Sequence, residues 1–174
     1  MHRLSITAIG RDRPGIVAAV TKVLFEQGCN LADCSMTMLG GQFAMIMLLD
    51  APDTLALGGL SGALKEVEAR LDLSIDVHDA PPGETPAPTR PYVISVYGAD
   101  HPGIVYRVTS ELAARHVNVT DLMSRIVGAN VYTVVLDADL PEGLDAGELE
   151  RELKAIAAEA GLDLSFREAE IESL

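Results

Sequence analysis

The chain of 174 residues contains the same pattern twice, and this duplication constrains its fold more than any other feature. The stretch GRDRPGIV begins at Gly10, and the stretch GADHPGIV begins 88 residues later, at Gly98. Ungapped identity over such a length predicts two copies of one folding unit. The same offset pairs Ile6 with Ile94, Val20 with Val108, Thr21 with Thr109, Leu24 with Leu112, Asn30 with Asn118, and Asp33 with Asp121.

A proline-rich segment, APPGETPAPTRP at residues 80–91, separates the two copies. Its five prolines exclude a helix or a central strand. Such a composition favours the extended polyproline II conformation, in which this segment would span about 35 Å. We therefore predict a first domain at residues 1–79, a linker at residues 80–91 and a second domain at residues 92–174.

Each copy shows the same order of hydrophobic patterns. A run rich in β-branched residues and ending in glycine comes first, at residues 3–10 and 92–98, and predicts a strand. An amphipathic helix, two strands about a glycine turn, a second amphipathic helix and a last strand follow in both copies. The order is βαββαβ, which predicts an α+β fold of two ferredoxin-like domains. In each, two helices would cover one face of a four-stranded antiparallel sheet.

The loop before the first helix of each copy is suited to a small anion. Proline fits the first turn of a helix, and an aspartate just before it, Asp12 or Asp100, lies near the positive end of the helix dipole. The glycine that follows leaves the backbone open to a ligand. The free N–H groups of the first helical turn then form an anion site. These groups belong to Gly15 and Ile16 in the first copy and to Gly103 and Ile104 in the second.

Asn30 and Asn118 open the next strand, and a carboxamide there offers both a donor and an acceptor. Together with the loop they suit a small zwitterion, with its carboxylate on the helix N-terminus and its ammonium group on an aspartate or a backbone carbonyl. The alternative is a well-made helix start and a turn asparagine with no ligand at all. The residues by themselves favour that alternative.

The stretch from Arg3 to Asp50 resembles an ACT domain, the small-molecule-sensing module of amino-acid-metabolism enzymes and regulators. The D-R-P-G-I-V loop, the G-C-N-L turn and the GGQFAMIMLLD strand carry the resemblance. The second copy resembles the family less closely. A chain of two such domains is most similar to the glycine cleavage system transcriptional repressor family.

The resemblance implies amino-acid binding in the loop between the first strand and the first helix, often at an interface between two ACT domains. The histidine of serine-binding members falls on glycine in both copies, so serine specificity does not carry over. His116 stands where the first copy has Gly28, which predicts that the two turns are not equivalent. The ligand-binding candidates are Gly10, Asp12, Arg13, Gly15, Ile16 and Asn30, and in the second copy Gly98, Asp100, His101, Gly103, Ile104 and Asn118.

Charge and hydropathy exclude several classes of function. The formal net charge is −13, and no Lys/Arg cluster offsets it, so the surface repels a phosphate backbone. We expect no direct nucleic-acid binding, and any role in gene control would need a partner protein. The sequence contains no run of 18 apolar residues, so it predicts no helix that spans a membrane. The N-terminal apolar stretch is too short for a signal peptide, so we expect a cytoplasmic protein.

No set of catalytic or metal-binding residues recurs in both copies. His101 has neither a nucleophile nor a metal partner in its pattern. Cys29 and Cys34 lack nearby histidines, so we interpret them as small, half-buried apolar residues rather than zinc ligands. The methionine pairs 36/38 and 45/47 each lie on one strand face, which favours core packing over an adaptable partner surface.

The predicted function is therefore regulatory, with no enzyme activity, no cofactor and no metal. The protein would bind a small amino acid, glycine or a related one, and control amino-acid metabolism or its transcription through a regulator or enzyme partner. The alternatives are a detached regulatory subunit of an amino-acid-metabolising enzyme and a ligand-free interaction scaffold. We expect the two copies to pack against each other through strand edges or through helices. Association of two chains into a homodimer is a further alternative.

Overall fold

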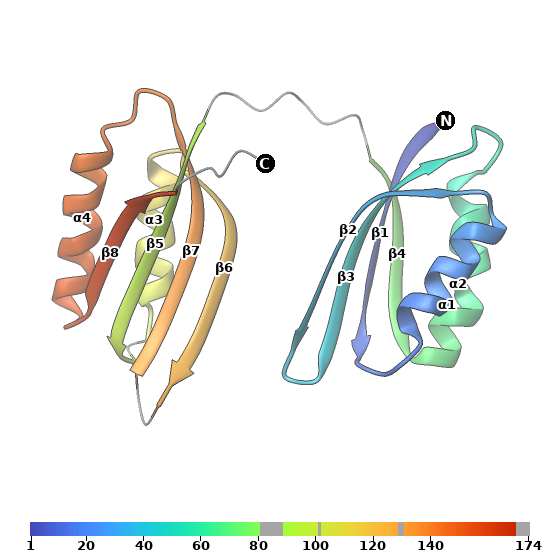
Figure 1. Cartoon of the computed structure of the whole chain (residues 1–174), viewed down its shortest axis with the longest axis horizontal. Helices are drawn as coiled ribbons and strands as arrows, with labels where there is room; N and C mark the ends of the chain where they lie inside the picture. Colours follow the sequence, from blue (N-terminus) through green and yellow to red (C-terminus); the bar gives the residue numbers. More distant parts are fainter. Residues whose placement is uncertain (81–88, 101, 129–130, 170–174) are drawn as a thin grey trace. The chain divides into compact units, whose positions relative to one another are not determined.

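The computed structural model of the chain describes residues 1–80, 89–100, 102–128 and 131–169 (Figure 1). The chain divides into two compact units, Met1–Glu84 and Thr85–Leu174, and each has its own sheet, helices and core. Most of the predicted linker lies outside the described residues, so its extended conformation stays a prediction.

The first domain is the predicted βαββαβ unit. Its sheet has the strand order β2-β3-β1-β4, and every neighbouring pair is antiparallel. Both helices lie on one side of this sheet (Figure 1). The elements are β1 (His2–Arg11), α1 (Ile16–Glu26), β2 (Asn30–Leu39), β3 (Gln42–Ala51), α2 (Leu57–Leu71) and β4 (Leu73–Asp79).

The second domain repeats this architecture, with the strand order β6-β7-β5-β8 and antiparallel pairing throughout. Two ferredoxin-like domains are therefore confirmed. The elements are β5 (Thr89–Ala99), α3 (Ile104–Ala114), β6 (Asn118–Val127), β7 (Val131–Pro141), α4 (Ala146–Glu159) and β8 (Asp163–Glu168).

Strand β5 begins at Thr89, three residues inside the segment that the sequence assigned to the linker. Pro91 pairs with Asp139 of β7, and its carbonyl accepts a hydrogen bond from the Ala169 N–H at 2.8 Å. Near the start of a strand proline costs little, because the ladder there needs few N–H donors. The high proline content of residues 80–91 led the sequence analysis to assign all of them to the linker.

Each core consists of the buried apolar residues that alternate with exposed ones along the strands and recur about every four residues along helices such as α1 and α3. In α1 the residues Ile16, Val20 and Leu24 are buried, at a spacing of four residues. In α3 the three residues at the matching positions are buried in the same way. These helical faces pack onto the alternate strand residues that point to the helix side of the sheet. Of the described helices, none is both long and apolar enough to cross a membrane.

The edge strand β2 is exposed along its whole length, which corrects two predictions. Met45 and Met47 of β3 lie in the core, as expected, but Met36 and Met38 of β2 are 51% and 60% exposed. Cys34, also in β2, is exposed rather than half-buried. Sequence periodicity identifies the face on which a side chain lies, but it does not show that β2 lies at the edge of the sheet.

Candidate functional site

The loop Asp12–Gly15 joins β1 to α1 and lies beside the turn between β2 and β3. The Asp12 N–H donates a hydrogen bond to the Gly41 carbonyl at 3.0 Å, which fixes the loop against that turn. Gly15 has φ 95°, a left-handed conformation that favours glycine, and its carbonyl accepts from the Ala19 N–H at 2.9 Å. The loop therefore ends in a fixed backbone turn from which the helix begins.

The N-terminus of α1 carries no side-chain cap. The N–H groups of its first turn face the loop, and the side chain of Ile16 is buried, so only the backbone of that residue is available there. A Cβ atom built on Gly15 would meet nothing within 4 Å, so the space above this glycine is open. By contrast, α4 begins with a cap, because Asp145 accepts a hydrogen bond from the Glu148 N–H at 3.0 Å.

The loop of the second domain has the same backbone form. Gly103 has φ 89°, its carbonyl accepts from the Arg107 N–H at 3.0 Å, and the side chain of Ile104 is buried. No side chain caps α3 within the part of the chain that the structure describes. Asp100 is exposed, and His101 lies outside the described residues.

The first loop presents charges of both signs. Asp12 and Arg11 are exposed and Arg13 is half-buried, and among the described residues none of the three forms an ion pair. An uncapped helix N-terminus favours a carboxylate, and the aspartate favours an ammonium group. The arrangement therefore suits a small zwitterion. Sequence reasoning did not consider Arg11, which directly follows the predicted strand at residues 3–10 and is the last residue of β1. Arg11 alternates along β1 with the residues that face the helices, so its side chain lies on the opposite face of the sheet.

Gly10 and Gly98 have a structural reason to be glycine. A Cβ atom on Gly10 would lie 2.7 Å from the carbonyl oxygen of Asp72 and 2.7 Å from a methyl carbon of Leu73. A Cβ atom on Gly98 would lie 2.5 Å from a methyl carbon of Leu162. The missing side chains therefore allow the last strand of each domain to approach closely. Ligand contact at these two glycines stays a prediction.

Within one domain, Asn30 does not lie near the loop, which corrects the expectation of a single pocket formed by both. Asn30 is paired with Asp50, which is paired with Arg3, whereas Gly10 lies at the far end of β1. Seven residues of strand correspond to roughly 23 Å. The βαββαβ topology explains this separation, because α1 runs back along the sheet before β2 begins. Asn118 is likewise level with Pro91, at the end of β5 opposite to the loop.

The turns after α1 and α3 are equivalent, although one contains Gly28 and the other His116. Both residues are left-handed, with φ 72° and 58°. In each turn the following residue, Cys29 or Val117, donates a backbone hydrogen bond to the leucine carbonyl five residues before it, at 2.9 Å. This is the Schellman arrangement of a helix end. The predicted difference between the two turns is therefore wrong for the backbone.

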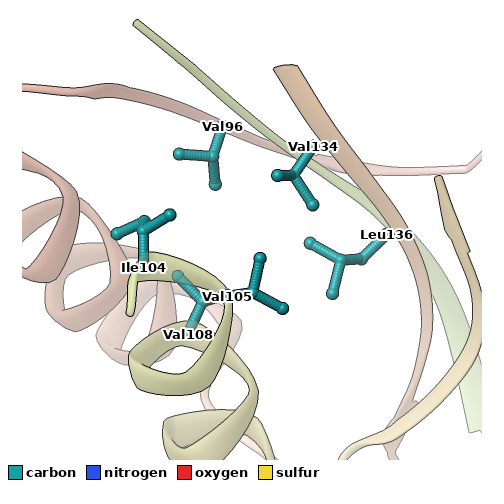
Figure 2. A pocket seen from close by; sticks show the side chains of 6 residues that line it. All are labelled: Val96, Ile104, Val105, Val108, Val134 and Leu136. Carbon is teal, nitrogen blue, oxygen red and sulfur yellow. The ribbon is translucent and has the colours of Figure 1, made fainter. Parts of the chain in front are cut away.

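A small apolar pocket lies between the start of α3 and the centre of the second sheet (Figure 2). It leaves no room for a water molecule, and it has no polar lining. An amino acid would find neither space nor a partner for its charged groups there. The pocket is therefore a small gap between packed core side chains and not a ligand site. It is lined by Val96, Ile104, Val105, Val108, Val134 and Leu136 (Figure 2).

Comparisons with known proteins follow the same division of the chain. Two family models, both described as ACT domain, match residues 2–78 and 92–158. The glycine cleavage system transcriptional repressor of Escherichia coli (strain K12) is 33% identical over 163 residues, covering 91% of this chain and 85% of the relative. A UPF0237 protein of Methanopyrus kandleri is 42% identical over 78 residues, or 44% of this chain and 84% of the relative. A crystal structure of a protein from Galdieria sulphuraria has a TM-score of 0.83 at 27% identity, covering 97% of this chain and 99% of that one.

Proposed function

The chain belongs to the ACT domain family, and on this basis we propose that it is a regulatory protein that binds a small amino acid at its two β–α loops. The bound and free forms would differ in their affinity for a protein partner. Through that partner the chain would control amino-acid metabolism or its transcription. The protein would have no catalytic role.

The observation that carries the proposal is the pair of uncapped helix N-termini behind Gly15 and Gly103. Each has an exposed aspartate in the preceding loop, and the space above each glycine is open. A carboxylate can accept hydrogen bonds from the free N–H groups, and an ammonium group can pair with the aspartate. The family and the relative named as a glycine cleavage repressor support glycine as the first ligand to test.

Calorimetric titration of the full chain with glycine, and then with the other common amino acids, tests the proposal. The expected result is saturable binding of one amino acid or a few related ones. Asp12→Asn or Asp100→Asn should weaken it, because each removes the charge that pairs with the ligand's ammonium group. Asp33→Asn is the matched control, since Asp33 is an exposed carboxylate on β2, away from the loop.

Two results would contradict the amino-acid proposal. One is the absence of binding by any amino acid at millimolar concentration. The other is binding that neither loop variant weakens while the control weakens it. The first result would favour the ligand-free scaffold, and the second would place the ligand elsewhere on the domains.

The partner part of the proposal needs a separate measurement. The Escherichia coli relative is named as a transcriptional repressor, and the acidic surface of this chain opposes direct contact with nucleic acid. We expect the partner to be a protein regulator or enzyme whose association changes when the amino acid is added. Affinity capture with the intact chain, with and without the bound amino acid, should show one partner whose recovery depends on the ligand.

A further inference from the structure

The first domain gathers five sulfur-bearing side chains, Met38 included, on one face of the β2–β3 hairpin, and four of them form two directly opposed pairs. Cys34 lies directly opposite Met47, and Met36 lies directly opposite Met45, in the register of the two antiparallel strands. Met45 and Met47 point to the helix side of the sheet, where they are buried, so their cross-strand neighbours point to that side as well. These four residues, Cys34, Met36, Met45 and Met47, are called the sulfur quartet below.

The strand geometry places the four side chains at the corners of a small rectangle. Residues directly opposite each other have Cβ atoms about 4.5–5.5 Å apart. Residues two apart along one strand are separated by about 7 Å. A methionine side chain has three rotatable bonds, so thioether sulfurs at these corners can converge on a point between them.

Burial within the quartet is graded, which provides both a dry side and a way in. Met45 and Met47 are each 1% exposed, whereas Met36 is 51% exposed and Cys34 is exposed on the edge strand. The hairpin lies at the side of the sheet, with β2 outermost (Figure 1). A small ion could therefore enter from solvent beside β2 and be held against the core.

Thiolate and thioether sulfurs are soft donors, and they select Cu⁺ over harder ions. We propose that the sulfur quartet binds one Cu⁺ ion in the first domain. On binding, the S–H bond of Cys34 breaks, its proton passes to solvent, and a sulfur–copper bond forms without change of oxidation state. The thiolate then neutralises the single positive charge, which lowers the cost of holding the ion against an apolar core. A divalent ion would keep a net charge there.

The second domain has the same strand register without sulfur. Leu122 lies opposite Leu136, and Ser124 lies opposite Val134. The site therefore belongs to the first domain alone, and the chain carries its own internal comparison. The site is separate from the amino-acid loops and does not depend on the proposed function.

Sequence reasoning missed the quartet because it tested the cysteines only as zinc ligands. Within the described residues, no three of His, Cys, Asp and Glu gather into a group that could hold a metal ion. Methionine lies outside that set of ligands. Two spacings in the sequence, Cys34-x-Met36 and Met45-x-Met47 on strands joined by a glycine turn, were the signal that could have predicted it.

The test is competition for Cu⁺ between the reduced full chain and the chromophoric chelator bathocuproine disulfonate, without oxygen. The chain should withdraw one equivalent of Cu⁺. Cys34→Ser and Met36→Leu should each weaken binding by about tenfold or more, since even the loss of a supporting partner of a metal ligand costs that much. Met45→Leu should weaken it as well, and this swap conserves side-chain volume.

Cys29→Ser and Met123→Leu are the matched controls, because Cys29 lies before β2 and Met123 lies in the second domain. Both should bind Cu⁺ as the unchanged chain does, and circular dichroism of every variant checks its fold. The proposal is overturned if the chain withdraws no Cu⁺ or if Cys29→Ser abolishes binding. It is also overturned if folded Met36→Leu and Met45→Leu bind as tightly as the unchanged chain, which would mean that the thiol acts alone.

Discussion

At the scale of single residues, different physical causes require glycine at different positions of this chain. Gly15 is glycine because its φ of 95° is strained for other residues, whereas Gly10 is glycine because the backbone at Asp72 lies too close for a side chain. A sequence motif does not separate these reasons. A ligand contact predicted from a pattern that recurs in both copies therefore competes with a packing explanation at each position.

Gly10→Ala should lower the free energy of unfolding of the first domain by about 1–3 kcal/mol, because its Cβ atom would overlap a backbone carbonyl that cannot move freely. Gly62→Ala is the control, since Gly62 lies in α2 with open space around it. Alanine there should raise the stability by about 0.5–1 kcal/mol. Denaturant unfolding with hydrogen exchange of first-domain peptides measures both, and equal effects would contradict the close-approach argument.

His116→Gly should raise the stability of the second domain by up to about 1 kcal/mol. His116 has φ 58°, and a side chain in this conformation carries a steric penalty that glycine avoids. Part of the gain is offset by the greater freedom of glycine in the unfolded chain. Removing the glycine at the matching position of the first domain, in Gly28→Ala, should be destabilising. A loss of stability in His116→Gly would contradict the argument that the strain at φ 58° outweighs the unfolded-state freedom of glycine.

At the scale of elements, one carboxylate links α2 to the strand that follows it. Glu68 accepts hydrogen bonds from the Lys65 ammonium group at 2.6 Å and from the Ile75 N–H of β4 at 3.2 Å. The hydrogen bond from Lys65, and then that from Ile75, lowers the pKa of the Glu68 carboxyl. The ionised form therefore favours the folded domain.

The linkage predicts how Glu68→Gln changes the pH dependence of stability. A carboxyl whose pKa is lowered on folding stabilises the fold above its unfolded pKa, about 4.3 for glutamate, and this contribution is lost as the pH falls through the lower folded value. The variant should therefore be less stable than the unchanged chain at pH 7, and the difference should shrink below about pH 4. Urea unfolding at both pH values measures it, and a gap that widens in acid would contradict the assignment.

Most of the element order was predictable from sequence, because helix and strand periodicities repeat in both copies and support each other. The backbone form of the loop before α1 was predictable because Asp12 and Gly15 are local to one turn, whereas ligand binding there stays a prediction. The position of Asn30 was not predictable, because it depends on the strand order β2-β3-β1-β4 and on the path of α1. The exposure of Met36 and Cys34 was missed for the same cause: periodicity does not reveal which strand is at the edge.

At the scale of the whole molecule, the charge distribution limits the partners that the chain can meet. The formal net charge of −13 gives a long-range repulsion toward polyanions that weakens as salt screens it. Binding to DNA would require clustered basic residues that neutralise phosphates. We therefore expect any role in transcription to be indirect.

The purified chain should consequently fail to shift duplex DNA in an electrophoretic mobility assay, even at low salt, where electrostatic attraction is strongest. Addition of the protein partner should restore a shift only if that partner binds DNA itself, and the amino acid should then change the position or amount of the shifted band. The control is the partner alone with the amino acid, which should show no ligand effect. A salt-sensitive shift by the chain alone would contradict the electrostatic argument and would place the contact on a basic surface that the sequence does not predict.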